Sequence, residues 1–406
     1  MPSSRDERPR VVMLVRNPFT HDSRVEKEAD TLRDAGFAVT IVCEWRDGLA
    51  RHETRRGVDV HRVPRRFARI PILRFLSYRS DLIRAVEETE PAILHAHDAN
   101  ALGEVGLVAA RREVPFVYDS HELWLRRTRH KHSRLYHGAM RAWHARVERR
   151  YVPRAAAVFT VSPPIATYLQ KQYKLQKVDL VANYPEVDQH LERRDLRELA
   201  GEGVIPSNAP ILLHIGLYGN DRGIEQVMEA LTRLPDVHFV LLGAGDRAGR
   251  AKQEAAALGI AARVHPLDRV PTDQVIAYAS SATIAIVPII PNDLSYEWAL
   301  PNKLFQSMAA ALPVIASDLP EMGAVVRETG AGLTVNARNP DEIVGAVRNL
   351  LASPALREQM GARGRAAVLE RYNWGVAAAT LVEAYRRIPL PRAPALPKGG
   401  LVEGDA

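Results

Sequence analysis

Residues 295–320 read SYEWALPNKLFQSMAAALPVIASDLP, and they say more about the architecture of this chain than any other stretch. Pro301 and Asn302 are typical of a helix start, and the apolar run 313–316 is typical of a buried strand. The spacing predicts a helix that begins at a sheet edge with Lys303 in its first turn. Free backbone N–H groups, the helix dipole and a lysine together favour a diphosphate. An ordinary crossover helix would begin in the same way, so the pattern alone leaves both interpretations open.

Outward from this stretch, apolar runs alternate with amphipathic helical segments along the whole chain. The predicted strands are 11–15, 38–43, 58–63, 92–95, 116–118, 157–161 and 179–182, followed by 211–215, 237–242, 262–265, 283–287, 314–316 and 332–335. This alternation predicts an α/β protein with two doubly wound parallel sheets. A length of 406 residues exceeds one ordinary domain and fits two.

Composition divides the chain further. We expect a first domain at 1–185, a polar linker at 186–209, a second domain at 210–375 and a C-terminal helix at 376–390. The tail 391–406 is rich in proline and glycine, and such segments are typically disordered.

Positive charge is concentrated in the first half. Residues 1–190 carry 33 Lys and Arg against 24 Asp and Glu, whereas the remainder carries 22 against 24. The charge is concentrated in the stretches 55–84 and 126–154, and apolar residues interleaved in the first stretch suit a basic amphipathic helix that lies on an anionic membrane surface or binds an anionic acceptor. A solvated arginine-rich face explains them equally well. No known nucleic-acid-binding module accompanies the charge, so we expect no nucleic-acid partner.

The sequence also indicates a compartment. A single cysteine, Cys43, excludes an internal disulfide framework and suits a reducing cytoplasm. Residues 1–10 are charged and lack the apolar core of a signal peptide, and no apolar stretch approaches the ~18 residues of a spanning helix. We expect a cytoplasmic protein, soluble or peripheral to the inner face of a membrane.

The segment 301–318 resembles the donor-binding motif of retaining glycosyltransferases of family four, in the branch that reads roughly P-N-K-L-F-E-Y-x-A-x-G-x-P-V-I-A-S-D. The family's other motifs have counterparts in the same order: Asn17, HDSRVEKE at 21–28, HAHDAN at 95–100, VYDSHE at 117–122, TVS at 160–162, Gly216, Arg222-Gly223 and YNW at 372–374. The resemblance implies a GT-B fold, in which two Rossmann-like domains face a central cleft. It assigns the acceptor to the first domain and the nucleotide sugar to the second, with the C-terminal helix crossing back.

The resemblance also implies a chemistry. A nucleoside-diphosphate sugar, with UDP or GDP as the expected nucleotide, would pass its sugar to a carbohydrate, lipid or small-molecule acceptor with retention of anomeric configuration. No Asp-x-Asp triplet occurs, so the usual carboxylate mount for a manganese ion is missing. We therefore expect no metal and no cofactor, with Arg and Lys neutralising the diphosphate.

Matching the family motifs gives three groups of candidate residues. The catalytic candidates are His121, Arg222 and Lys303. The donor-binding candidates are Gly216, Glu297, Pro301, Asn302, Leu304, Gln306 and Ser162. The acceptor-side candidates are Asn17, Asp22, Arg24, His97, Asp98, Asp119 and Glu122.

Simpler structural roles stay open for several candidates. Asp98 and Ser162 each precede a predicted helix and are typical helix caps. Arg222 also fits a surface arginine at a helix start. His121 also fits a histidine that caps or packs a strand end.

The chain departs from the family pattern at four positions. Leu217 stands where the family often has an arginine, directly after the glycine that corresponds to Gly216. Asp268 stands where the family often has a glycine, near the pocket for the nucleotide base. Gln306 replaces the glutamate that binds the ribose hydroxyls, at an expected cost of about 1 kcal/mol. Trp298 replaces the family's first glutamate, which leaves Glu297 as the nearest acid. These departures keep two alternatives open: a nucleotide-sugar epimerase of the same fold, and a catalytically degenerate binding subunit.

Overall fold

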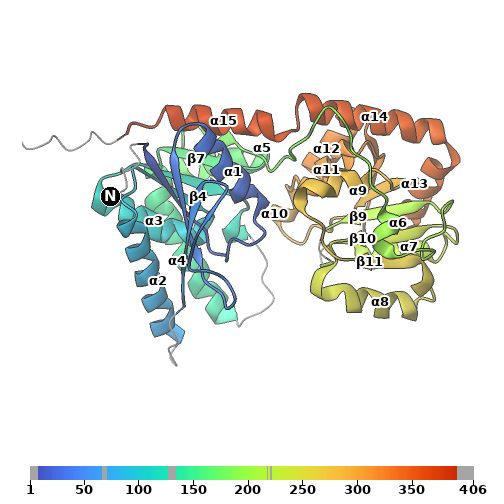
Figure 1. The fold of residues 1–406 in the computed structure, drawn as a ribbon, viewed down its shortest axis with the longest axis horizontal. Coiled ribbons are helices and arrows are strands. Elements are labelled where there is room, and N and C mark those ends of the chain that lie inside the picture. The colour runs from blue at the N-terminus through green and yellow to red at the C-terminus, as the bar shows by residue number, and fades with distance from the viewer. Residues whose placement is uncertain (1–7, 66–70, 127–133, 217, 220–221, 391–406) are drawn as a thin grey trace, which may run out of the picture.

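A computed structural model describes residues 8–65, 71–126, 134–216, 218–219 and 222–390 of the protein. It contains two α/β units, each built on its own sheet with helices on both faces, joined by a long helical segment along one side (Figure 1). The predicted α/β class with two parallel sheets is confirmed.

The first domain is built on a sheet of the order β3-β4-β2-β1-β5-β6-β7-β8. Its strands are β1 (Arg10–Leu14), β2 (Ala38–Glu44), β3 (His52–Arg55), β4 (Val58–Val63), β5 (Ile93–His97), β6 (Phe116–Ser120), β7 (Ala157–Thr160) and β8 (Asp179–Leu180). β3 pairs antiparallel with β4, and the other pairings are parallel. The strands β1, β2, β5 and β6 are almost entirely buried, as expected for parallel strands covered on both faces. β1 and β2 are mostly apolar, whereas β5 and β6 carry polar residues toward their ends.

Five helices and the C-terminal helix cover this sheet. They are α1 (Ser23–Asp34), α2 (Pro71–Glu88), α3 (Ala99–Arg112), α4 (Arg134–Tyr151), α5 (Pro163–Tyr173) and α15 (Trp374–Arg386). Apolar residues of α2, α3, α4 and α5 form one core with the sheet, whereas those of α1 and α15 form a second core on its other face.

The second domain contains a parallel sheet of the order β11-β10-β9-β12-β13-β14. Its strands are β9 (Ile211–Ile215), β10 (His238–Leu242), β11 (Val264–Leu267), β12 (Ile284–Val287), β13 (Val314–Ser317) and β14 (Gly332–Val335). Its helices are α6 (Leu196–Ala200), α7 (Ile224–Leu231), α8 (Ala248–Ala257), α9 (Val275–Ala279), α10 (Leu294–Glu297), α11 (Asn302–Ala309), α12 (Pro320–Thr329), α13 (Pro340–Ala352) and α14 (Pro354–Glu370). Helices α7, α8 and α13 pack on one face, and α9, α11, α12 and α14 on the other.

The last two helices connect the domains. α14 packs against α11 in the second domain, and α15 returns to contact α1 and β8 in the first. At the start of α15, Trp374 Nε1 donates to Thr31 Oγ1 at 3.0 Å, and the Lys27 ammonium lies 4.6 Å from the Trp374 ring centre. The C-terminal helix is thus fixed to the first helix of the chain.

The structure corrects several sequence-based expectations. β3 was missed because its residues are polar and partly exposed, without the apolar run of a buried strand. The linker 186–209 contains the short helix α6. The helix expected at Pro301 begins at Asn302, as predicted, and it ends at Ala309, shortly before Ala311, which adopts a left-handed φ of 57°. The tail 391–406, Leu217 and parts of both basic stretches lie outside the described residues.

Within the described residues, no helix combines the length and the apolar character that crossing a membrane requires.

Candidate active site

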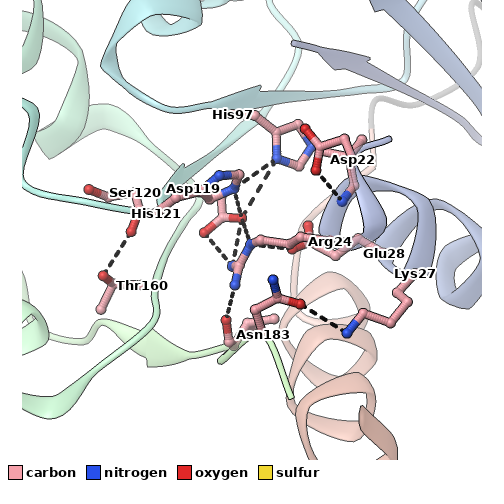
Figure 2. Close-up of polar contacts among 12 residues, drawn as sticks. Asp22, Arg24, Lys27, Glu28, His97, Asp119, Ser120, His121, Thr160 and Asn183 are labelled. Carbon is pink, nitrogen blue, oxygen red and sulfur yellow. Dashed lines mark hydrogen bonds and ion pairs between the residues drawn. The ribbon is translucent and has the colours of Figure 1, made fainter. Parts of the chain in front are cut away.

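In the first domain, candidate residues gather where β5 and β6 end and α1 begins (Figure 2). His97 ends β5, and Asp119 lies one residue before the end of β6. Asp22 accepts from the Val25 amide and so caps α1, which places Arg24 in the first turn of this helix. Parallel strands end at the same edge of a sheet, and polar side chains from separate motifs meet there.

Arg24 and Asp119 form the centre of this cluster. Arg24 Nε and Nη2 donate to Asp119 Oδ2 at 3.1 and 2.8 Å, and Nη2 also lies 2.8 Å from Oδ1. Arg24 Nη1 donates to the Val181 carbonyl at 2.6 Å. Burial opposes ionisation of Asp119, but Arg24 and His121 outweigh it and hold the pKa of this carboxyl well below its ordinary value. Asp119 is therefore a fixed negative charge in the buried part of the site.

Glu28, one helical turn after Arg24, is in a different protonation state. Its Oε1 lies 3.0 Å from Arg24 Nε, yet neither carboxyl oxygen accepts a hydrogen bond from a described residue. Burial and the charge of Asp119 raise the pKa of Glu28 to about 8. Glu28 is accordingly neutral at pH 7, and Arg24 forms its ion pair with Asp119.

His121 follows β6 and lies between two carboxylates. Its Nε2 is 2.9 Å from Asp119 Oδ2, its Nδ1 is 3.5 Å from Asp98 Oδ2, and its backbone amide donates to Asp98 Oδ1 at 3.0 Å. Desolvation opposes the charged form, but Asp98 and Asp119 outweigh it and raise the pKa of His121 to about 9. The His121 and Asp98 side chains are 21% and 20% exposed, so a positive imidazolium reaches the surface.

Two of the simpler structural roles fail at this edge of the sheet. Asp98 precedes α3 but makes no side-chain cap hydrogen bond, because its carboxylate accepts from the His121 amide instead. Ser162 precedes α5, and its buried hydroxyl neither caps that helix nor forms a hydrogen bond with another described residue. Asn17 donates to Asp22 at 2.7 Å and accepts from the Phe19 amide, so it shapes the loop before α1.

His97 links the cluster to the interior of the sheet. Its Nδ1 lies 3.3 Å from His121 Nε2 and 3.7 Å from Asp119 Oδ2. Burial lowers the pKa of His97, so this ring is neutral. Glu28, His97, Asp119 and His121 place one ligand atom each within 4.8 Å of one another, a set that could hold a metal ion. Arg24 already donates to Asp119 within this set, so a permanent positive charge lies among the same oxygens.

In the second domain, Lys303 occupies the first turn of α11 and its ammonium lies over Gly216. A Cβ at Gly216 would lie 3.1 Å from Lys303 Nζ, and the φ of 106° at this residue also favours glycine. Lys303 Nζ lies 3.0 Å from His214 Nε2, and His214 Nδ1 lies 3.3 Å from the Ile286 carbonyl. The carbonyl places the ring proton on Nδ1, which leaves Nε2 to accept from Lys303.

The ionisation of this pair differs from that of His121. Desolvation, followed by the charge of Arg222, holds the pKa of Lys303 well below its ordinary value. Desolvation, Lys303 and Arg222 likewise hold the pKa of His214 well below 6.5. His214 is therefore neutral near pH 7, and Lys303 gives up its proton more readily than an exposed lysine while the site is empty of a counter-charge.

Arg222 enters the same region from the loop before α7. Its guanidinium lies 5.4 Å from the Tyr296 ring centre. Gly223, which follows, has a φ of 59°, and a Cβ there would lie 2.5 Å from the Pro288 carbonyl oxygen at the end of β12. Only glycine fits so close to the Pro288 carbonyl, which explains the glycine after Arg222.

The remaining donor-side candidates differ in their surroundings. Leu304 and Gln306 are buried, Leu304 as part of the domain core. Pro301 stands at the cap of α11, and the buried Asn302 Oδ1 accepts from no described residue. Glu297 is the last residue of α10. His214 was missed by sequence analysis, although a histidine two residues before the glycine that ends β9 was a usable signal.

Helix α10 brings the two parts of the site together. Ser295 Oγ accepts from the Leu123 amide at 2.9 Å. Leu123 is two residues after His121, and Ser295 is two residues before Glu297. Trp298 lies against Tyr168, with ring centres 6.2 Å apart, and packs on the core of the first domain. The position at which the family has its first glutamate is thus part of an apolar domain contact.

Two families match the chain in succession. Residues 23–188 match the family described as Glycosyltransferase Family 4, and residues 197–367 match the Glycosyl transferases group 1.

Individual proteins are similar to both halves. The chain is 24% identical over 254 residues to an alpha-D-kanosaminyltransferase of Streptomyces kanamyceticus. The aligned region covers 60% of this chain and 63% of that protein. It is 27% identical over 334 residues to a D-inositol 3-phosphate glycosyltransferase of Acidothermus cellulolyticus, which covers 76% of the chain and 71% of that protein. The chain thus spans less than two thirds of the length of the first relative. HepE from Anabaena, solved in complex with UDP and glucose, has a TM-score of 0.73 at 13% identity, covering 94% of this chain and 100% of that one. This likeness confirms the predicted GT-B fold.

Proposed function

We propose that this chain, which matches two glycosyltransferase families in succession, moves a sugar from a nucleoside-diphosphate sugar to an acceptor hydroxyl, with retention of anomeric configuration and without a metal. The observation that carries the proposal is the position of Lys303. Its ammonium lies over Gly216 at the start of α11, beside Arg222. A diphosphate at this point would meet free helix amides and two cationic side chains.

The proposed chemistry assigns a separate task to each half of the site. On the donor side, Lys303 and Arg222 stabilise the negative charge that grows on the diphosphate as the bond to the anomeric carbon breaks. The diphosphate oxygen then takes the proton of the acceptor hydroxyl on the same face of the sugar. On the acceptor side, the His121 imidazolium and Asp98 offer hydrogen bonds to sugar hydroxyls, since both side chains reach the surface.

The donor is proposed to carry UDP or GDP. UDP is favoured because HepE, which has the same fold, was solved with UDP and glucose. Gln306 is assigned to the ribose hydroxyls, where an amide can both donate and accept. Neutralisation by Lys303 and Arg222 supports transfer without a metal.

The basic surface of α4 in the first domain supports the proposed acceptor class. Arg146, Arg149 and Arg150 are exposed on α4 beside Trp143, which is 40% exposed. Such a basic helix with an aromatic side chain suits an anionic lipid surface or an anionic polysaccharide. We propose a cytoplasmic enzyme that acts on a carbohydrate, lipid or small molecule, in peripheral contact with the membrane. Co-flotation with vesicles containing phosphatidylglycerol, lost in an Arg146→Glu/Arg149→Glu variant, tests the membrane contact.

Thermal unfolding with UDP, GDP, ADP, TDP and CDP, each in EDTA, tests the donor. A nucleotide at a hundred times its Kd adds about 2.7 kcal/mol to the free energy of unfolding. We expect one nucleotide to stabilise the protein, and Lys303→Met to abolish the shift. Arg250→Met, which removes an exposed arginine elsewhere on the second domain, is the matched control.

Transfer assays with the sugars of that nucleotide then test the reaction. We expect free nucleoside diphosphate and a glycoside whose anomeric configuration, read by NMR, equals that of the donor. An isomeric nucleotide sugar would make the protein an epimerase. Stabilisation by none of the nucleotides, with or without Mg²⁺, would make it a degenerate binding subunit.

A further inference from the structure

Tyr385 on α15 reaches the interior of the first domain, close to the histidine cluster. Its hydroxyl lies 2.9 Å from His95 Nδ1, and Tyr385 is 1% exposed. The ring packs edge-on against Phe37 and is stacked at 6.4 Å from Phe159. Burial holds the pKa of the phenol well above its ordinary value, so Tyr385 is neutral and carries one proton to donate.

This proton determines the tautomer of His95. The His95 ring is buried and its pKa lies well below 6.5, so it carries one ring proton. When Tyr385 donates to Nδ1, that proton occupies Nε2, the atom that faces Glu28 Oε2 at 3.8 Å. In this tautomer the buried Nε2–H points toward a Glu28 oxygen beyond hydrogen-bond distance. In the alternative tautomer the Nε2 lone pair would face that oxygen, and the phenol proton would have no acceptor among the described residues.

His95 is in turn coupled to the surface histidine. The His95 and His97 rings are stacked, with centres 4.2 Å apart and planes at 20°. His97 Nδ1 lies 3.3 Å from His121 Nε2, which contacts Asp119. A continuous series of side chains therefore runs from the C-terminal helix to the candidate catalytic histidine.

We propose that Tyr385 is a positioning residue for His121: its hydroxyl fixes the tautomer and orientation of His95, and the stacked His97 carries that orientation to His121. The role of His121 in glycosyl transfer rests on the proposed function, whereas its coupling to Tyr385 does not. Because α14 packs on α11 and continues into α15, the same helical segment that borders the donor domain also orders the acceptor-side histidine.

The charged and titratable groups that face this series come from three elements. α1 and its cap contribute Asp22, Arg24 and Glu28, β6 and the residues after it contribute Asp119 and His121, and the loop after β5 contributes Asp98. Tyr385→Phe changes none of these charges. A change in the titration of His121 in this variant therefore reports orientation and not a lost charge.

Histidine side-chain NMR of the full chain is the test, with Tyr385→Phe as the variant because it keeps the ring and removes only the O–H. Tyr173→Phe is the matched control, since it removes a buried phenol that donates to Glu148 Oε2 at 2.8 Å in the same domain. We expect wild-type His95 to be protonated on Nε2, Tyr385→Phe to mix its tautomers and move the pKa of His121, and Tyr173→Phe to leave both unchanged.

Kinetics give the functional readout. We expect kcat of Tyr385→Phe to fall by about 3- to 10-fold, the loss of one hydrogen bond, with KM for the nucleotide sugar and the UDP-induced thermal shift unchanged. A wild-type His95 protonated on Nδ1 overturns the proposal even if the variant does not fold. Equal histidine spectra for wild type and Tyr385→Phe also overturn it. A changed histidine spectrum in a protein without transferase activity leaves the coupling standing and refutes the proposed function instead.

Discussion

Binding of UDP to the proposed donor site is expected to take up a proton at Lys303. In the free protein, desolvation and Arg222 keep the pKa of Lys303 well below its ordinary value. A diphosphate placed over the same ammonium reverses the balance, because opposite charge favours the protonated amine. The pKa of Lys303 is then higher in the complex than in the free protein, so complex formation takes up protons, with one per UDP as the upper limit.

The magnitude follows from linkage. A group whose pKa is raised by the ligand makes affinity fall as pH rises between its free and bound pKa values, with a limit of tenfold per pH unit for one proton. Above about pH 7 the terminal phosphate of UDP is almost fully ionised, since its second pKa is about 6. His214 stays neutral throughout because desolvation and the adjacent cations hold its pKa well below 6.5. The Kd for UDP is therefore expected to rise with pH across the interval between the free and bound pKa values of Lys303, by at most tenfold per pH unit.

Isothermal titration calorimetry in two buffers of different ionisation enthalpy measures the proton directly. We expect proton uptake of up to one per UDP in the wild type and of none in Lys303→Met, whose Kd should lose this pH dependence. Arg250→Met on α8 should behave as the wild type. A wild-type Kd that is flat with pH, with no proton uptake, would refute the reasoning, because Lys303 would then be charged before UDP arrives. Uptake that persists in Lys303→Met would place the proton on another group.

Three further predictions concern single positions. Gln306→Glu should tighten UDP binding by about fivefold in calorimetry, because a carboxylate strengthens the ribose contact; an unchanged Kd would remove Gln306 from the ribose site. Trp298→Ala should lower the free energy of unfolding by about 1–3 kcal/mol and increase the radius of gyration in solution scattering, since the contact with Tyr168 is lost; unchanged scattering would contradict a domain contact. Glu28→Gln should stabilise the protein at about pH 9 but not at about pH 5 in denaturant titrations. Because the pKa of Glu28 is raised to about 8 in the folded protein, the stability of the wild type falls as the pH rises above the pKa of this carboxyl in the unfolded chain. Each pKa unit of difference amounts to about 1.4 kcal/mol. Equal effects of the substitution at both pH values would contradict a buried neutral carboxyl next to Asp119.

The fold was largely predictable because it depends on local signals. Buried parallel strands such as β1 and β9 are continuous apolar runs, and α11 begins where Pro301 predicts it. β3 was not predictable on that basis, because an antiparallel edge strand with polar residues lacks the run that marks the others. Its pairing with β4 depends on the short connection between them and not on apolar burial.

The site was predictable only as a set of residue types. Motif order identified Lys303, Arg24 and His121, but it could not reveal their partners. Arg24 and Asp119 are 95 residues apart, and Lys303 and His214 are 89 apart. Such pairs form only when parallel strands place their ends at one sheet edge, and no local pattern encodes which side chains then meet. For the same reason, the contact that Asp98 makes could not be predicted. Its position before α3 is a local signal for a helix cap, but its contact with the His121 amide has no local signal.

The two halves of the site handle charge in opposite ways, and this determines where a charged substrate acts. On the acceptor side, the positive charges of Arg24 and His121 are matched by Asp119 and Asp98, so the cluster is already balanced and fixed in orientation. On the donor side, Lys303 has no carboxylate partner among the described residues, and desolvation and Arg222 hold its pKa well below the ordinary value. A diphosphate therefore changes protonation only on the donor side, where it supplies the missing negative charge. The acceptor side stays preorganised, and the hydrogen bonds it presents to a sugar do not need to rearrange as the leaving charge develops.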